Sequence, residues 1–335
     1  MKTQNTALPA QHYTQYFPLI IRLTVGWIYF SAFWRRVALS NKLDPESIGY
    51  IGEKFNNFLP NALFIKPMIQ WLVENPDALW INMVAFTIIE GVVGLFLILG
   101  LFTRLSGLGA TFLALGILLG AGWLGTTCLD EWQIGVFGII TGAYLFFSGG
   151  GALSLDNKLK LGSKFNFWMS GDLGEKFSNS FITKAVIITS ISALAITLGT
   201  NQYFHGGVWG TLHNLSKNPK IELYSASFEN DFVQFEAIRT EGIDTYGSFV
   251  IEARLADASG NIIYTWDDIQ LAEMESSNID NKYVAKVKLG KHGLEFPLGA
   301  LATIRLPLKR KIESQKAHTL ILEDVSGKTW SINLD

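Results

Sequence analysis

The sequence predicts a membrane α-helical bundle followed by an all-β domain with the architecture of an immunoglobulin-like sandwich. Only 17% of the 335 residues are Asp, Glu, Lys or Arg, below the roughly 25% that is usual in soluble proteins. Charged residues are nearly missing from five long apolar stretches before residue 200, and the mean hydropathy of the whole chain is +0.25. After that point the hydrophobic periodicity changes to two, which indicates strands.

Each of the five apolar stretches approaches the roughly 20 residues that span a bilayer core as a helix. They cover residues 17–34, 79–102, 105–125, 132–148 and 182–199, and the fourth is the shortest. Glycines such as Gly91, Gly94 and Gly107 recur within them, which suits close helix packing in lipid. We expect a four-helix core and a fifth transmembrane helix.

The connection between the first two predicted helices has a different pattern. Pro60, Pro67 and Pro76 divide it into short pieces in which apolar residues recur at helical spacing. We expect these pieces to form an amphipathic lid over about residues 40–78, on the outer side of the membrane.

Eight short segments with alternating apolar and polar residues follow the fifth helix. They cover residues 220–228, 232–239, 249–256, 262–266, 283–289, 301–308, 318–324 and 329–334. Short strands separated by turn signals, with no helical stretch between them, favour an antiparallel sandwich. We expect this domain to serve in covering, assembly or partner contact rather than in chemistry, since its sequence has no metal or nucleophile motif.

These patterns give the domain boundaries. We predict a four-helix membrane domain over 1–160, a cytoplasmic linker over 161–181, the fifth helix over 182–199 and an extracytoplasmic β-sandwich over 200–335. Lysines concentrate between the fourth and fifth helices, which places that connection and the N-terminus in the cytoplasm of a bacterial or archaeal-type inner membrane. Trp34, Trp80, Trp123 and Trp132 then all lie at outer helix ends. Arg35 and Arg36 also fall on the outer side, which is contrary to the tendency of Lys and Arg to lie in cytoplasmic connections.

Composition excludes several classes of function. The net charge of −2 does not favour binding to nucleic acid. Cys128 is the only cysteine, so an intrachain disulfide, a Cys-rich zinc site and an iron–sulfur cluster are excluded. Neither histidines within spans nor a GxGxxG motif after a strand are present, so we predict no metal, haem or flavin. A redox function then needs a diffusible carrier such as a quinone.

Two charged residues lie deep inside the predicted spans, where charge is costly, whereas Lys184 lies at the edge of the fifth. Arg22 is in the first helix and Glu90 is near the middle of the second. We expect both to face the bundle interior and to contact each other directly or through Thr24 and Thr87. Such a contact is either a structural ion pair or part of a proton relay to a quinone, and the sequence leaves both open.

A second cluster is predicted at the outer face. Arg35 and Arg36 end the first helix, and the loop with Thr127 and Cys128 joins the third and fourth helices at the same depth. Two guanidiniums beside hydroxyl donors and a thiol favour binding of a small sulfur oxyanion, and nearby cations favour the thiolate. Asp130 and Glu131 oppose this unless they point away or accept protons. An inert, buried Cys128 remains the alternative.

Several motifs resemble a known family. They are Arg22…Gly26…Phe30, Glu90-Gly91-x-x-Gly94, Gly100-Leu101-Phe102-Thr103-Arg104, Cys128-Leu129-Asp130-Glu131-Trp132-Gln133-Ile134-Gly135 and Gly149-Gly150-Gly151-x-x-Ser154-x-Asp156. Together they resemble the DoxX-like, and more particularly the DoxD, membrane family. The fifth helix and the β-domain from about Gly206 resemble DoxA fused behind it.

The resemblance implies a thiosulfate:quinone oxidoreductase, which oxidises thiosulfate to tetrathionate and reduces membrane quinone. It implies that Arg35, Arg36, Thr127, Trp34 and Trp132 bind thiosulfate, and that Cys128, Asp130 and Glu131 are catalytic. Arg22, Glu90 and Arg104 are then candidates for quinone or proton handling. The expected partners are membrane lipid, quinone and thiosulfate. A homo-oligomer, a non-catalytic assembly protein and a transporter of small sulfur compounds remain alternatives.

Overall fold

A computed structural model describes residues 11–47, 49–122, 131–171, 173–204, 206, 208–211, 219–229, 231–242, 248–310, 312–313 and 316–334. The chain divides into two compact units, which are described separately here. The first unit comprises Met1–Tyr50, Ile81–Leu118 and Gln133–Thr211. The second comprises Ile51–Trp80, Leu119–Trp132 and Leu212–Asp335. Most of the connection between the first two long helices, called the outer connection after its expected side of the membrane, therefore belongs to the same unit as the β-domain.

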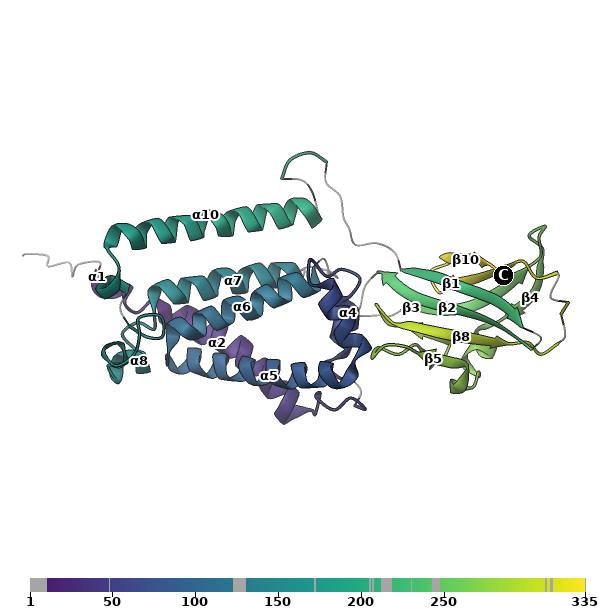
Figure 1. Ribbon diagram of the computed structural model, residues 1–335, viewed down its shortest axis with the longest axis horizontal. Helices are drawn as coiled ribbons and strands as arrows, with labels where there is room; N and C mark the ends of the chain where they lie inside the picture. Colours follow the sequence, from purple (N-terminus) through teal and green to yellow (C-terminus); the bar gives the residue numbers. More distant parts are fainter. Residues whose placement is uncertain are drawn as a thin grey trace, which may run out of the picture. The chain divides into compact units, whose positions relative to one another are not determined.

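The first unit is helical (Figure 1). Its long helices are α2 (Pro18–Trp34), α5 (Pro76–Leu99), α6 (Thr103–Ala121), α7 (Glu131–Ser148) and α10 (Asn179–Phe204). The shorter ones are α1 (Gln11–Thr14), the π-helix η1 (Arg35–Leu39), α8 (Leu155–Lys158), the 3₁₀-helix η2 (Leu161–Ser163) and α9 (Leu173–Lys176). A core of Val25, Tyr29, Val93, Leu97, Ala110, Leu113 and Leu145 joins α2, α5, α6 and α7.

Three helices of the described chain are long and apolar enough to cross a membrane. They are the segments Pro76–Leu99, Thr103–Ala121 and Asn179–Tyr203. The apolar segment Trp132–Ser148 is shorter, as the sequence predicts for the fourth span. α2 has 17 residues and is followed directly by the five residues of η1, so the helical backbone continues past the apolar stretch. α10 differs from the other two candidate spans because none of its apolar window is buried.

Close helix contacts account for several glycines of the apolar stretches, although Gly116 and Gly199 have open space around them. A Cβ atom added at Gly94 of α5 would overlap the backbone of Phe30 in α2, and one at Gly26 would lie 2.9 Å from the carbonyl oxygen of Gly94. On the other side of the bundle, a Cβ at Gly107 of α6 would lie 2.8 Å from the carbonyl oxygen of Gly142 in α7. The helix backbones approach one another directly at these points, which only glycine permits.

The second unit contains the outer connection, which is predicted to fold into short helices. α3 (Glu53–Phe58) and α4 (Lys66–Glu74) confirm this. Pro67 lies in the first turn of α4 and Pro76 begins α5, where the missing N–H of proline costs no helical hydrogen bond. Leu59, Ile69 and Val73 of this segment are buried together, whereas Phe64 and Trp71 are exposed.

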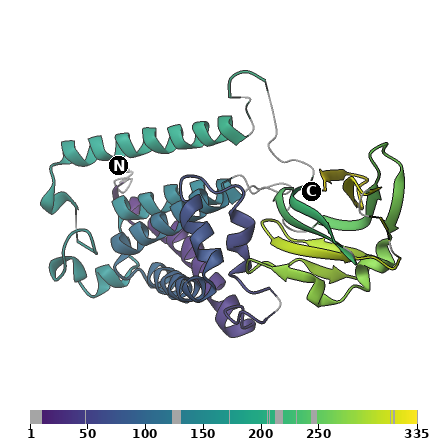
Figure 2. The same cartoon turned by 45° about the vertical axis from the view of Figure 1, so that its right-hand side comes forward.

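The β-domain has two antiparallel sheets that share one hydrophobic core (Figures 1 and 2). The first sheet has the order β1-β2-β8-β5, formed by Lys220–Glu229, Phe232–Glu241, Leu301–Pro307 and Ile279–Asn281. The second has the order β10-β9-β3-β7-β6, with β4 also paired to β3. Its strands are β10 (Thr329–Asn333), β9 (Thr319–Asp324), β3 (Ser248–Ala256), β7 (Gly293–Phe296), β6 (Lys288–Gly290) and β4 (Ile262–Trp266). The predicted two-sheet sandwich is confirmed.

One predicted strand is wrong. Residues 283–289 alternate apolar and polar residues but form no continuous strand; β5 ends before them and β6 begins only at Lys288. The alternation comes from one-sided burial of the segment, since Ala285 and Val287 are buried. The Ala285 N–H donates to the Asn56 side chain of α3 and not to a neighbouring strand. A short helix, α11 (Asp268–Ala272), also interrupts the predicted all-strand pattern.

Candidate functional site

A buried ion pair joins η1, which continues α2, to α5 inside the first unit. Arg36 Nη1 donates to Glu90 Oε2, and the two side chains are only 17% and 6% exposed. The Arg36 guanidinium also lies 6.0 Å from the centre of the Phe86 ring, one turn before Glu90 on α5. The predicted position of Glu90 inside the bundle is correct, but its partner is Arg36 and not Arg22.

Helix geometry explains this partner. Arg22 and Tyr29 are spaced by seven residues and follow one face of α2, and Arg36 comes seven residues later in η1, which continues α2 directly. The guanidinium of Arg22 bonds the carbonyl oxygens of Leu97 and Ile98, which lie seven and eight residues beyond Glu90 on α5. At 1.5 Å per helical residue, that level is about 10 Å from Glu90 along the axis. Arg36 is at the right height to reach the carboxylate, and Arg22 is not.

Two further polar side chains are buried near the ion pair. Tyr29 is 6% exposed, donates from its hydroxyl to the carbonyl oxygen of Ala110 at 3.0 Å, and interacts electrostatically with Glu90. Thr87 lies three residues before Glu90 and is 1% exposed. Among the described residues its hydroxyl has no hydrogen-bond partner. The sequence predicts Thr87 only as a link between Arg22 and Glu90. Tyr29 was not predicted, although its spacing of seven residues from both Arg22 and Arg36 indicates the same face.

The two adjacent arginines have different surroundings. Arg35 is exposed, its Nε donates to the carbonyl oxygen of Ser31 at 3.3 Å, and its charge acts on Glu90. Trp34 beside it is 47% exposed. Arg36 turns inward to Glu90. One guanidinium is therefore open to an anion from solution, and the second already holds a carboxylate.

The other predicted residues of the outer cluster belong to the α6–α7 connection. Thr127, Cys128 and Asp130 lie outside the described residues, as does the side chain of Glu131. Trp132 is 3% exposed and belongs to the second unit.

Arg22 anchors the opposite end of the first unit. Its Nη1 donates to the carbonyl oxygens of Leu97 at 3.2 Å and Ile98 at 2.7 Å, and its Nη2 donates to Leu153 at 2.8 Å. A Cβ at Gly100 would overlap this guanidinium. Arg22 thus binds the carbonyl end of α5, where a cation complements the helix dipole.

Asp156 and Arg104 make corresponding contacts with α6 and α7. The Asp156 carboxylate accepts hydrogen bonds from the backbone N–H groups of Phe102 at 2.7 Å and Thr103 at 2.8 Å, which caps the start of α6. Arg104 donates to carbonyl oxygens at the end of α7, including Phe147 at 2.9 Å, and to Gly171 at 2.7 Å. These contacts give Arg22 and Arg104, predicted to handle quinone or protons, a structural role in closing helix ends.

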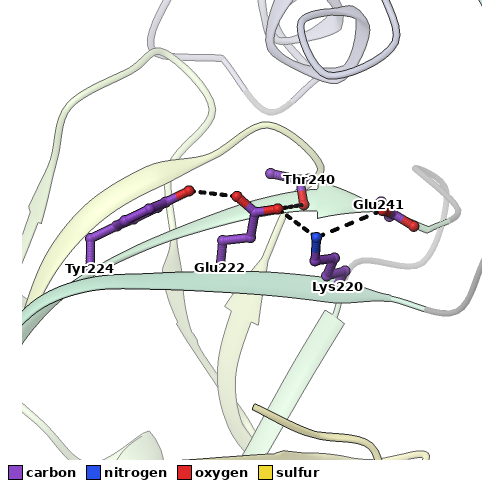
Figure 3. A network of polar contacts seen from close by, with 5 residues as sticks. All are labelled: Lys220, Glu222, Tyr224, Thr240 and Glu241. Carbon is purple, nitrogen blue, oxygen red and sulfur yellow. Dashed lines mark hydrogen bonds and ion pairs between the residues drawn. The ribbon is translucent and has the colours of Figure 1, made fainter. Parts of the chain in front are cut away.

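The β-domain carries a separate polar network on β1 and β2 (Figure 3). The Glu222 carboxylate accepts hydrogen bonds from Lys220 at 2.7 Å, Tyr224 at 2.5 Å and Thr240 at 3.3 Å. The Lys220 hydrogen bond and then the Tyr224 hydrogen bond lower the pKa of Glu222, while the same contact with Glu222 raises the pKa of Tyr224. β1 is an edge strand, and such charged groups oppose pairing with another chain. We assign this network to the surface of the sheet.

In the part of the chain that the structure describes, no cluster of three or more His, Cys, Asp or Glu side chains is arranged to hold a metal ion. The residues that the structure brings together are an arginine, a carboxylate, a phenol and a hydroxyl, between helices of membrane length. Arg36 and Glu90 are ionisable groups of opposite charge in this set, and the exposed Arg35 lies beside them in the sequence.

Apolar helices with a buried ion pair, followed by a two-sheet domain, define a membrane protein with an appended β-domain. Residues 17–182 match the family described as TQO small subunit DoxD, and residues 204–333 match the family described as TQO small subunit DoxA. The chain belongs to the DoxD/DoxA family and is a fusion in the order DoxD, then DoxA. This confirms the resemblance expected from the motifs. A comparison with curated proteins found no match.

Proposed function

We propose that this protein is a thiosulfate:quinone oxidoreductase, which oxidises thiosulfate to tetrathionate and reduces a diffusible membrane quinone. The observation that supports it best is the buried Arg36–Glu90 ion pair, within a chain whose two parts both match TQO small-subunit families. An ionisable pair between apolar helices is costly and marks a functional site by default. The proposed reaction requires both a binding site for an anion and a source of protons, and an arginine paired with a carboxylate can supply both.

The overall reaction sets these requirements. Two thiosulfate ions lose one electron each as they join to form tetrathionate, and one quinone takes up both electrons with two protons. Sulfur oxidation releases no protons, so the protein has to deliver them to the quinone from water. Glu90 is a buried carboxylate of the described bundle, and it is our candidate for this delivery.

Charge balance links the two requirements. Arg35 and Arg36 with ionised Glu90 carry one net positive charge, whereas thiosulfate is a dianion. When the dianion binds both guanidiniums, Arg36 has to leave Glu90. The buried carboxylate then lacks a counter-charge, and protonation is the least costly way to restore neutrality. Anion binding is thus coupled to loading of a proton on Glu90, ready for transfer to the quinone.

Cys128 is the proposed nucleophile. Its thiolate attacks the outer sulfur of the first thiosulfate, and a Cys–sulfur bond forms as two electrons pass to quinone. A second thiosulfate attacks that outer sulfur, which releases tetrathionate and regenerates the thiolate. Arg35 and Arg36 hold the sulfonate end with Thr127, Trp34 and Trp132 around the site, and Asp130 and Glu131 accept protons from the thiol and its surroundings.

The orientation follows from the distribution of lysines. With the lysine-rich connection between α7 and α10 in the cytoplasm, the N-terminus is cytoplasmic and the DoxA-type domain is extracytoplasmic. Arg35 and Arg36 then face the side from which thiosulfate arrives.

Anaerobic mixing of the purified protein with thiosulfate and a soluble quinone tests this function. We expect one quinol and one tetrathionate for every two thiosulfate ions consumed. Quinol absorbance and tetrathionate are followed in the same sample. Movement of thiosulfate across vesicles without quinol formation would instead support a transporter, and inactivity with a bound protein partner would support an assembly role.

A further inference from the structure

The β-domain holds the outer connection of the DoxD-type half through a buried asparagine. Asn56 of α3 is fully buried. Its Nδ2 donates to the carbonyl oxygen of Gly299 at 3.3 Å, and its Oδ1 accepts from the backbone N–H of Ala285 at 3.1 Å. The side-chain amide thus pairs with the β-domain backbone in the way that a neighbouring strand would.

The loop that receives Asn56 is shaped for this contact. Gly299 has a φ of +76°, and a Cβ there would overlap the carbonyl oxygen of Asn56. The buried Arg239 supports the loop from within the domain, since its carbonyl oxygen accepts from the Gly299 N–H at 2.8 Å and its Nη1 donates to Phe296 at 3.1 Å. The site needs glycine for both backbone conformation and space.

Apolar contacts surround this polar centre. Tyr283 packs on the cluster of Leu59, Ile69 and Val73, and Leu298 packs with Ala121 and Phe58. Leu298 lies in a loop and is nevertheless fully buried. At the edge, the Tyr283 hydroxyl bonds Glu74 of α4. An aromatic and aliphatic patch with one satisfied polar centre is the composition of a specific protein interface.

We propose that this surface is how a DoxA-type domain recognises a DoxD-type membrane domain, and that it acts without the covalent linker. Residues 17–182 and 204–333 match two families that are each described as a subunit. The contact surface of the β-domain is built from Tyr283, Ala285, Leu298 and Gly299, and its partner is the outer connection around α3 and α4. Where DoxD and DoxA are separate chains, the same surface joins the subunits.

The experiment cuts the full-length protein after it has folded. A protease site is inserted between Leu212 and Pro219, an affinity tag is placed at the N-terminus, and the purified protein in detergent is cleaved and washed. We expect the β-fragment to stay bound to the tagged membrane fragment. Asn56→Leu should raise its dissociation rate at least tenfold, because it leaves the Gly299 carbonyl and the Ala285 N–H without a partner.

Asn57→Leu is the matched control, since the neighbouring asparagine on the same helix is half-buried, and it should release no more fragment than the unsubstituted protein. Gly299→Ala tests the contact from the β-domain side and should also release the fragment. Circular dichroism before cleavage checks that each variant is folded. Loss of the β-fragment from the unsubstituted protein on cleavage, or equal retention by Asn56→Leu and Asn57→Leu, would overturn the proposal. The readout is retention, so it does not depend on the proposed catalytic activity.

Discussion

Arg36 of η1 donates a hydrogen bond to Glu90 of α5, while Arg35, the preceding residue, is exposed and acts on the same carboxylate only through its charge. Two chemically identical side chains thus have different tasks. We propose that the exposed guanidinium of Arg35 meets the anion first and that the guanidinium of Arg36 exchanges the Glu90 carboxylate for it.

The first prediction concerns stability. Arg36→Gln leaves Glu90 buried without a counter-charge, so we expect a loss of about 3–5 kcal/mol in the free energy of unfolding. Arg36→Gln combined with Glu90→Gln should recover most of this loss but not quinone reduction. Arg35→Gln is the matched control and should change stability by less than about 0.5 kcal/mol, since its side chain is exposed. Thermal unfolding in detergent measures all four proteins, and equal losses for Arg35→Gln and Arg36→Gln would contradict the assigned roles.

The second prediction separates binding from proton delivery. Arg35→Gln should raise the half-saturating concentration of thiosulfate about tenfold, because a charge-assisted contact is lost. Glu90→Gln should lower the maximal rate of quinone reduction about 100-fold, the usual scale for loss of an acid or base. Steady-state kinetics measure both parameters. An unchanged half-saturation in Arg35→Gln counts against the anion site.

The third prediction tests the thiol. Cys128→Ser should abolish thiosulfate-dependent quinone reduction, since an alcohol is a far weaker nucleophile than a thiolate. Intact-mass measurement after addition of thiosulfate and quinone should show an adduct on the unsubstituted protein and none on the variant. Retained turnover in Cys128→Ser removes the covalent scheme and leaves the arginine site possible.

The fourth prediction concerns alkaline pH. Burial, followed by the charge of Glu74, raises the pKa of Tyr283 above its ordinary value of 10.0. The folded protein therefore keeps the Tyr283 proton at a pH where the unfolded chain has lost it, and stability falls as pH rises from about 10 through the folded-state pKa. The melting temperature should fall more steeply above pH 10 in the unsubstituted protein than in Tyr283→Phe. Parallel curves would contradict this assignment.

Much of the fold could be predicted from the sequence. A membrane-spanning helix needs an apolar stretch of a certain length, and a strand with one buried face alternates apolar and polar residues. Apolar length indicates the helices of the first unit, and alternation indicates β2 and β9, whose buried residues alternate along the strand. The segment 283–289 was predicted as a strand because one-sided burial gives the same alternation. There the buried face contacts the outer connection through Tyr283 and Ala285, and periodicity alone does not distinguish the two causes.

The candidate site was predicted less completely. Charge within apolar stretches correctly indicates Arg22 and Glu90 as buried, but pairing them neglects their heights along the two helices. The seven-residue spacing of Arg22, Tyr29 and Arg36 was available in the sequence and places Arg36 on the buried face. The role of Asn56 was not accessible, because its partners Ala285 and Gly299 are more than 200 residues away in the chain.

The central claim is that binding of thiosulfate to Arg35 and Arg36 loads a proton on Glu90. Proton uptake on adding thiosulfate to the oxidised protein without quinone, followed with a pH indicator in weak buffer, tests it most directly. We expect uptake of about one proton for each bound thiosulfate in the unsubstituted protein, as charge neutrality of a buried site requires, and none in Glu90→Gln. Binding without proton uptake, or equal uptake by Glu90→Gln, would contradict it.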